Sequence, residues 1–171
     1  MVQIARHLGA GIIIGTTRSR ENASELLGIG FTAVLGGSEE AVAGEVGSLV
    51  EGGVDLVIDM VGGSTINSNV LSTAIGGRIV HVGRLGGTRG SMNLDEFARR
   101  QITMKGVTFR TRSLQERIVV TRSFERMILP LMAAGVLRPR VAEEVGLEAV
   151  LEAERLLGRA RRLGKVTLTV S

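Results

Sequence analysis

Four short apolar runs that alternate with helix-like segments constrain the fold of this chain more than any other feature. The runs are rich in Val, Ile or Leu and lack the polar–apolar alternation of a half-exposed strand; they are Gly11–Ile14, Thr32–Leu35, Val54–Asp59 and Arg78–Val82. Such continuous apolarity is typical of parallel strands that are buried on both faces. The segments between them have helical spacing: Arg20–Leu27, Glu39–Val50 and Thr65–Ile75. The pattern predicts an α/β fold, a parallel sheet covered by crossover helices.

Small residues at the segment ends indicate where the helices begin and end. Three serines stand at expected helix starts, where a hydroxyl oxygen can accept a hydrogen bond from a free backbone N–H: Ser19, Ser38 and Ser64. Glycines stand where helices should give way to strands: Gly9, Gly30, Gly52, Gly53, Gly76 and Gly77. The hydrophobic content of 44% provides enough material for a core.

The second half of the chain leaves this plain alternation. Its expected helices are Leu94–Arg100, Leu114–Ala134 and Leu147–Leu157, and its expected strands are Ile102–Phe109, Val141–Val145 and Lys165–Val170. Pro130 should kink the long helix or begin its last turn. We interpret the last strand–helix–strand portion as part of a second structural unit.

Composition excludes several classes of protein and site. The chain has no cysteine, so disulfides, thiolate metal sites and cysteine nucleophiles are excluded. No apolar run reaches the roughly 20 residues that span a bilayer, and Arg6 and His7 interrupt any signal-peptide pattern. We therefore expect a cytoplasmic protein with no membrane partner. The net charge of +4 comes from arginine clusters without interleaved aromatics, which favours a phosphate-bearing small molecule over nucleic acid.

The turn after the first apolar run carries hydroxyls and arginines where some dinucleotide-binding chains carry an acid. In a dinucleotide fold the end of the second strand meets the adenosine ribose; a carboxylate there selects NAD, whereas hydroxyls with arginine admit a 2′-phosphate. The first acid here is Glu21, already inside the next helix. The candidate phosphate ligands are Thr16, Thr17, Arg18, Ser19 and Arg20. This turn favours NADPH as the cofactor; the alternative interpretation is an ordinary capped turn with solvated arginines.

Two further strand ends are candidate cofactor contacts, because ligands of open parallel sheets bind outside the carboxyl ends of the strands. The strand Val54–Asp59 runs into a glycine pair, and we predict contacts at Val61 and Gly62, with Asp59 as a structural carboxylate that accepts backbone N–H bonds. The strand Arg78–Val82 runs into a glycine-rich loop that should face the nicotinamide. Its candidate residues are Val82, Gly83 and Arg84, and the alternative is a flexible hinge.

His81 lies inside the apolar strand that ends at this loop. A histidine in such a position is more often a core residue with satisfied hydrogen bonds than an acid or base. We therefore assign it no catalytic role.

Taken in order, these stretches resemble the medium-chain dehydrogenases/reductases, in their quinone oxidoreductase (zeta-crystallin-like) branch. The matching stretches are VQIARHLGAGIIIGTTRS, GVDLVIDMVGG, GGRIVHVGRLGG and the run from Leu147 to Val170, which contains LGKVTLTV. TFRTRS and VLRPRV are similar to the NADPH:quinone reductase members. The resemblance covers essentially the whole chain.

The resemblance implies a Rossmann domain of strand order 3-2-1-4-5-6 over residues 1–135. Residues 136–171 would be a segment that returns to a GroES-like catalytic domain. The family's first strand and glycine-rich loop come before the helix that ends at Gly9. We therefore expect an incomplete, doubly wound parallel sheet and a chain equivalent to the C-terminal half of the family's proteins, either truncated or a fragment.

Site residues also follow from the resemblance. The lysine and tyrosine that hold the 2′-phosphate in well-known members correspond to Asn22 and Gly37, so Arg18 or Arg20 would take their place. An arginine near the family's cofactor corresponds to Arg112, with Arg110 as the second choice. Any zinc ligands of the superfamily lie in the other half, and no metal ligand or catalytic residue is assigned here.

The implied activity is NADPH-dependent hydride transfer to a quinone or an activated alkene such as an enone, by a homodimer that associates near Ile102–Phe109. The alternative is a catalytically silent fragment that serves at most as an oligomerisation or interaction module. Loss of a central strand would forfeit about 5–10 kcal/mol of apolar burial. That is comparable with the whole stability of a typical domain, roughly 5–15 kcal/mol.

Overall fold

The computed structural model describes residues 1–17, 21, 23–158 and 163–170, which form an α/β fold with parallel sheets. The predicted fold class is therefore confirmed. The chain divides into two compact units, each described by itself below. The first unit comprises Met1–Gly15, Ser19–Val34 and Ile118–Ser171, and the second comprises Thr16–Arg18 and Leu35–Arg117.

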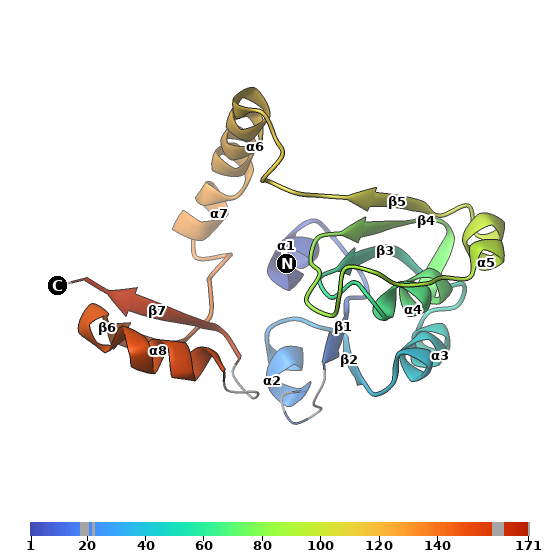
Figure 1. The fold of residues 1–171 in the computed structure, drawn as a ribbon, viewed down its shortest axis with the longest axis horizontal. Coiled ribbons are helices and arrows are strands. Elements are labelled where there is room, and N and C mark those ends of the chain that lie inside the picture. The colour runs from blue at the N-terminus through green and yellow to red at the C-terminus, as the bar shows by residue number, and fades with distance from the viewer. Residues whose placement is uncertain (18–20, 22, 159–162, 171) are drawn as a thin grey trace. The chain divides into compact units, whose positions relative to one another are not determined.

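A three-stranded parallel sheet is the centre of the second unit (Figure 1). Its strands are β3 (Val54–Asp59), β4 (Thr73–His81) and β5 (Thr103–Gly106), in the order β3-β4-β5. The register pairs Asp59 with His81, and His81 with Gly106. The last residues of the three strands therefore lie side by side, at the edge of the sheet where ligands of such folds bind.

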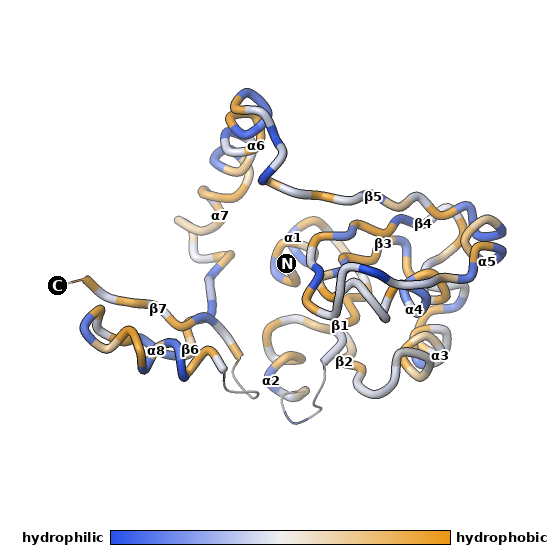
Figure 2. Tube along the Cα trace, viewed as in Figure 1, coloured by the Kyte–Doolittle hydropathy of each residue, from blue (hydrophilic) through white to orange (hydrophobic). Residues whose placement is uncertain are grey.

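The helices of the second unit are α3 (Glu39–Leu49), α4 (Thr65–Ser72) and α5 (Leu94–Arg99), and α4 contacts both β3 and β4. Figure 2 shows the concentration of apolar residues along β3 and β4. The core of this unit is built on Val70, Ile79 and Ile102, surrounded by Val57, Met92, Phe97 and Met104. It is mostly aliphatic, as the near absence of aromatic residues from the sequence requires.

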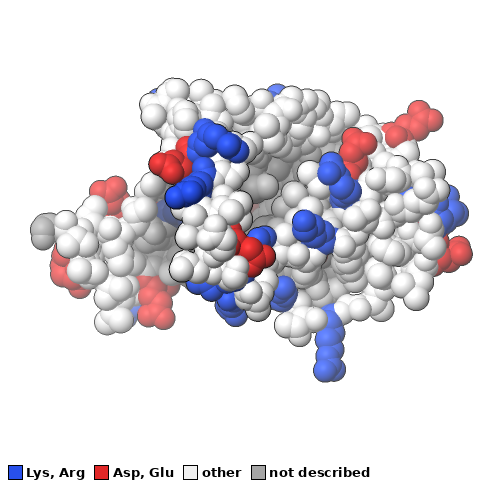
Figure 3. Space-filling view, turned by 90° about the horizontal axis from the view of Figure 1, so that it is seen from above, with Lys and Arg blue, Asp and Glu red and all other residues white. Residues whose placement is uncertain are grey.

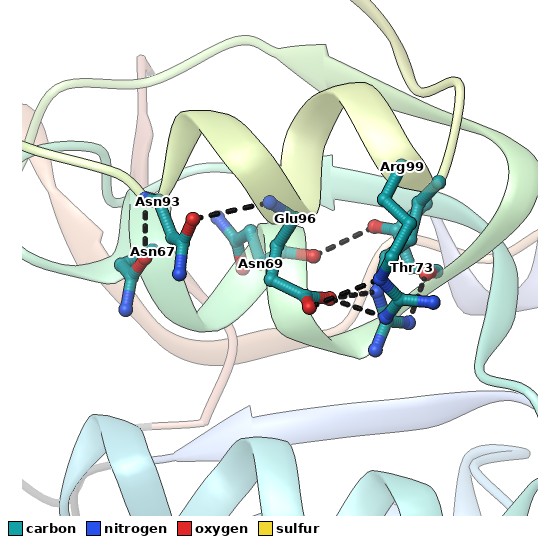
Figure 4. A network of polar contacts seen from close by, with 7 residues as sticks. Asn67, Asn69, Thr73, Asn93, Glu96 and Arg99 are labelled. Atoms are coloured by element: carbon teal, nitrogen blue, oxygen red, sulfur yellow. Dashed lines mark hydrogen bonds and ion pairs between the residues drawn. The ribbon is translucent and has the colours of Figure 1, made fainter.

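A polar network fastens α5 to the opposite, amino end of the sheet (Figure 4). Glu96 binds both Arg99 and Arg100, with closest N···O distances of 2.7 and 2.9 Å. Arg100 Nη1 donates to the carbonyl oxygen of Thr73 at 2.8 Å, and Thr73 Oγ1 donates to the carbonyl oxygen of Asn69 at 2.6 Å. Since Thr73 begins β4, this network supports the fold and lies away from the candidate binding edge.

In the first unit, β6 (Val141–Gly146) and β7 (Lys165–Thr169) pair in parallel, and α8 (Val150–Leu157) packs against both. The N-terminal helix α1 (Val2–His7) joins the segment before β6 through a reciprocal pair of hydrogen bonds. Gln3 Nε2 donates to the Arg138 carbonyl at 3.2 Å, and the Arg138 N–H donates to Gln3 Oε1 at 3.0 Å. The first unit also contains α2 (Ala23–Gly28) and α7 (Leu129–Ala133).

The two-stranded sheet of β1 (Ile14–Thr17) and β2 (Ala33–Gly36) corrects one prediction. The first strand was expected at Gly11–Ile14 but begins at Ile14 and includes the hydroxyl-bearing Thr16 and Thr17. The apolar run therefore lies mostly before the strand. The strand itself continues through Gly15, Thr16 and Thr17, which are not strongly apolar.

The helix ends predicted from the sequence agree with the structure in some cases and not in others. The hydroxyl of Ser38 accepts a hydrogen bond from the Ala41 N–H at 3.3 Å, as predicted. The predicted cap at Ser64 is wrong: its backbone is already helical, and the Thr65 N–H donates to the Gly62 carbonyl instead. Pro130 lies in the first turn of α7, which follows α6 (Leu114–Met127), so the predicted interruption is confirmed. None of the helices in the described part of the chain has the length and apolarity needed to cross a membrane.

Candidate functional site

Asp59, the last residue of β3, is the centre of the candidate site. It is 4% exposed, and its Oδ1 accepts hydrogen bonds from the backbone N–H groups of Val61 and Gly62, both at 2.9 Å. Thr65 Oγ1 lies 3.4 Å from the same oxygen. The prediction that Asp59 is a structural carboxylate for its own turn is confirmed.

The second carboxylate oxygen of Asp59 is held by His81, the last residue of β4. His81 Nδ1 lies 2.8 Å from Asp59 Oδ2. Burial raises the pKa of Asp59, but hydrogen bonds from the Gly62 N–H, from His81 and from the Val61 N–H outweigh it and lower the pKa below its ordinary value. The carboxylate is therefore ionised at neutral pH and can only accept, so Nδ1 carries the hydrogen of this bond.

The main chain of Asp59 organises a second loop. Its carbonyl oxygen accepts hydrogen bonds from the N–H groups of Val82 at 2.8 Å and Gly83 at 3.1 Å. The Gly86 N–H donates in turn to the Val61 carbonyl at 2.8 Å. The turn at residues 60–63 and the loop at residues 82–90, which we call the paired loops, are thus joined to each other and to the end of β3.

Five of the predicted site residues lie in the paired loops around Asp59, namely Val61, Gly62, Val82, Gly83 and Arg84. The carbonyl of Arg84 accepts a hydrogen bond from the Gly87 N–H at 3.2 Å. These five residues form one local assembly at the carboxyl ends of β3 and β4. Their contact with a cofactor stays a prediction.

The glycines of the paired loops also have a use that was not predicted from the sequence. A Cβ atom on Gly83 would collide with the carbonyl oxygen of Met60, and one on Gly63 would collide with the carbonyl oxygen of Gly86. Gly62 has a φ of +66°, and a Cβ there would lie 2.8 Å from the His81 ring. Gly63 and Gly83 let the two loops approach each other, and Gly62 leaves space for the His81 ring. The close approach of a ligand to these glycines stays a prediction.

The hydroxyls of the predicted ribose turn lie on another strand. Thr16 is exposed and Thr17 is half-buried at the carboxyl end of β1. The hydrogen bonds around Asp59 do not involve either residue. The other predicted residues of this turn, Arg18, Ser19 and Arg20, lie outside the described residues, as does Asn22.

Arg112 lies on the segment between β5 and α6, which is folded on itself. Its Nε donates to the Thr108 carbonyl at 3.1 Å. Arg117 donates to the carbonyl oxygens of Arg112 at 3.0 Å and Arg110 at 3.1 Å, and its guanidinium lies over the Phe109 ring, 5.7 Å from the ring centre. Arg112 therefore lies in a turn that is held by hydrogen bonds between residues close in sequence.

Ser113 and Glu116 begin α6 with reciprocal hydrogen bonds. The Ser113 N–H donates to Glu116 Oε2 at 2.8 Å, and the Glu116 N–H donates to Ser113 Oγ at 3.3 Å. Hydrogen bonds from the backbone and then the side chain of Ser113 lower the pKa of Glu116. This cap was not predicted, although a serine followed three residues later by glutamate is its usual signal in a sequence.

The Asp59–His81 pair is the other feature that the sequence analysis missed. Both residues end buried apolar runs in consecutive strands of the expected parallel sheet. Parallel strands that end at the same level place such residues side by side. The two strand ends were therefore visible in the sequence, but the Asp59–His81 contact could be predicted only with the register between the strands.

Comparison with known proteins gives one family match. Residues 1–125 match the family model described as zinc-binding dehydrogenase. The chain is 29% identical over 170 residues to an acryloyl-coenzyme A reductase of Metallosphaera sedula, covering 98% of this chain and 46% of that protein. It is also 29% identical over 171 residues to quinone oxidoreductase-like protein 2 of Bos taurus, covering 99% and 49%.

A solved structure agrees with the fold. The structure of an NAD-dependent alcohol dehydrogenase superposes with a TM-score of 0.82 at 30% identity, covering 99% of this chain and 47% of that one. The chain thus spans about half the length of each of these relatives.

The family description implies a zinc ion, and the described residues of this chain do not form a site that fits it. The sequence has no cysteine, and within the described ranges no group of three or more His, Cys, Asp or Glu side chains is arranged to hold a metal. We therefore derive no chemical step through zinc from this chain.

Proposed function

The chain belongs to the zinc-binding dehydrogenase family, and from this premise we propose that it is the cofactor-binding part of an NADPH-dependent oxidoreductase. The observation that carries the proposal is the assembly of the paired loops at the carboxyl ends of β3 and β4. Open parallel sheets bind their ligands at this edge. Five of the residues predicted from the sequence as cofactor contacts belong to this assembly: Val61, Gly62, Val82, Gly83 and Arg84.

Each part of the site has a proposed task. The bound nicotinamide would supply the hydride, as in other enzymes where the cofactor carries the reactivity. The paired loops would orient it with backbone groups, because Asp59 and close glycine packing hold those groups in place. Thr16 and Thr17, together with Arg18, Ser19, Arg20 and Arg112, would hold the ribose and phosphate portions through hydroxyls and guanidinium groups.

The choice of NADPH over NADH rests on the sequence of the turn after β1. Residues 15–20 contain hydroxyls and arginines and no acid, and Glu21 is the first carboxylate. A carboxylate nearer the strand would repel a 2′-phosphate, whereas arginine attracts it. The alcohol dehydrogenase of similar fold is NAD-dependent, and titration of this chain with both cofactors measures its own preference.

For the substrate we propose a quinone or an activated alkene. Two relatives support this class, since one is named a quinone oxidoreductase-like protein and the other an acryloyl-coenzyme A reductase. An acryloyl group and a quinone both have a carbon–carbon double bond conjugated to a carbonyl. The acryloyl group can accept a hydride at its β-carbon, and the quinone can accept one at a ring carbon or a carbonyl oxygen. Each then takes up a proton from water or from the protein.

We also propose a homodimer and no nucleic-acid partner. Among the described residues, β5 is an edge strand of its sheet and so offers an edge for pairing with a second copy. On the face shown in Figure 3, acidic side chains are interspersed with the cationic ones. A nucleic-acid surface would instead gather cationic side chains into a patch or stripe.

A kinetic assay tests the proposed activity. The chain would be joined behind the N-terminal half of quinone oxidoreductase-like protein 2, because it spans only half of that relative. We expect oxidation of NADPH, followed by absorbance, with a quinone or an enone and slower oxidation of NADH. A folded chimera that oxidises neither cofactor with either substrate contradicts the proposal.

A second candidate function is an interaction module without catalysis. The observation that favours it is the outer edge of β3, which no other strand pairs in the described part of the chain. Concentration-dependent association measured by sedimentation, without binding of either cofactor, would support this second candidate over the first.

A further inference from the structure

His81 contacts both the buried carboxylate of Asp59 and the turn at residues 60–63 that this carboxylate organises. Its Nδ1 binds Asp59 Oδ2 at 2.8 Å, and the other oxygen of that carboxylate accepts the N–H groups of Val61 and Gly62. The side chain of Asp59 is 2% exposed, whereas that of His81 is 23% exposed. The imidazole therefore lies between solvent and a buried carboxylate that organises a backbone turn.

The carboxylate depends on this imidazole for one of its two oxygens. Oδ1 has two backbone donors and a longer contact with Thr65, while His81 is the side chain that satisfies Oδ2. A buried charged oxygen without a donor is costly. Loss of His81 would therefore favour rotation of the carboxylate toward water, which would misalign the bonds to Val61 and Gly62.

The ring also packs directly against the turn. A Cβ atom on Gly62 would lie 2.8 Å from His81 Cε1, so the imidazole fills the space beside that glycine. The same turn is bonded to the second loop through the Gly86 N–H and the Val61 carbonyl. A change at His81 would thus reach both of the paired loops.

We propose that His81 is a positioning residue for the cofactor: through Asp59 it holds the paired loops in the arrangement that the bound dinucleotide meets. This inference rests on the proposed function, since the loops must contact the cofactor. Its physical basis is preorganisation, because groups that are already aligned need not be ordered when the ligand binds.

Three variants of the chain test the inference. His81→Leu removes the donor, His81→Asn keeps an N–H donor near the position of Nδ1, and His7→Leu removes the other histidine, which is exposed on α1. We expect amide hydrogen exchange at Val61 and Gly62 to accelerate about tenfold or more in His81→Leu, and NADPH affinity to fall about tenfold. His81→Asn should recover most of both properties, and His7→Leu should leave both unchanged.

The outcomes separate this inference from the proposed function. If the unaltered chain binds neither NADPH nor NADH, the proposed function fails, and the exchange rates still decide whether His81 aligns the turn. Unchanged exchange at Val61 and Gly62 in a folded His81→Leu variant would overturn the inference. So would unchanged NADPH affinity in that variant when the unaltered chain binds the cofactor.

Nitrogen NMR of the unaltered chain provides a measurement that needs no variant. We expect the proton of neutral His81 on Nδ1, because the ionised Asp59 accepts from that atom. A neutral imidazole with its proton on Nε2 would overturn the inference. That result would overturn the inference even if His81→Leu does not fold.

Discussion

The carboxylate of Asp59 is ionised although it is almost completely buried, because four hydrogen-bond donors surround it. These are the N–H groups of Val61 and Gly62, Thr65 Oγ1 and His81 Nδ1. Its lowered pKa means that the folded chain holds the charged form more firmly than the unfolded chain does. The resulting stability is present above the ordinary pKa of 3.8 and is lost as the pH falls through the lower, folded value.

Replacement of this carboxylate should destabilise the second unit at neutral pH. We expect Asp59→Asn to lower the free energy of unfolding by about 1–3 kcal/mol, because an amide cannot replace both acceptor oxygens. The variant should also lose less stability than the unaltered chain as the pH falls from 5 to 2, because it has no Asp59 carboxylate to protonate. Urea unfolding across that range measures both effects. Asp55→Asn, at an exposed position of the same strand, is the control, and equal effects of the two changes would refute this account of Asp59.

Gly83 shows how little space separates the paired loops. A Cβ atom there would collide with the Met60 carbonyl, which cannot move without disturbing the end of β3. We expect Gly83→Ala to lower the free energy of unfolding by about 1–3 kcal/mol. Gly106→Ala, in β5 with open space around the position, should cost much less. Similar losses in the two variants, measured by urea unfolding, would show that the loops are not tightly packed.

Among the elements, α5 depends on charge for its attachment to the sheet. Hydrogen bonds from Arg99 and then Arg100 lower the pKa of Glu96 to about 2 from the ordinary value of 4.5. The stabilisation of the fold by the ionised Glu96 is therefore complete above pH 4.5 and disappears as the pH falls through about 2.

Glu96→Gln should therefore lower the melting temperature at pH 7, and the difference from the unaltered chain should shrink as the pH approaches 2. Because Arg100 also holds the Thr73 carbonyl, the loosened arginine should free the start of β4. Thermal unfolding monitored by circular dichroism at several pH values measures the effect. Glu51→Gln at an exposed position is the control. A difference that does not vary with pH would argue against the charge-based attachment.

The elements that could be predicted from the sequence are those with a strong local pattern. The strand Val54–Asp59 was predicted at its observed bounds, because an apolar run ends there in an acid and a glycine turn. The boundary between α4 and β4 was not: the helix ends at Ser72 and the strand begins at Thr73, several residues before the expected Arg78. Helical and strand spacing cannot be distinguished over such a short stretch, and pairing with β3 decides it.

The candidate site was predictable in its location but not in its internal bonding. Strand ends with glycines are visible in the sequence, so the positions of Val61, Gly62, Val82 and Gly83 could be inferred. The role of His81 could not, because it depends on a cross-strand register that lines it up with Asp59. Because the same register pairs Asp59 with His81, the two loops that follow these residues start side by side, and glycines such as Gly63 and Gly83 allow their close contact.

Two of the three sheets in the described part of the chain contain the strand neighbours that the implied order 3-2-1-4-5-6 has on either side of its strand 1. The pair β1–β2 corresponds to strands 2 and 3 of that order, and β3-β4-β5 corresponds to strands 4, 5 and 6. Family membership and the similar solved structure support this assignment. The chain spans about half of the relatives it matches, so the substrate pocket and the catalytic cycle remain proposals for the complete protein.

We propose that this chain contains the cofactor site and that the site prefers NADPH. Calorimetric titration of the 171-residue chain with NADPH and with NADH measures both properties. We predict heat of binding with both cofactors and at least about tenfold tighter binding of NADPH, equivalent to about 1.4 kcal/mol. No binding of either cofactor by the folded chain would contradict the claim that it carries the site, and tighter binding of NADH would contradict the preference.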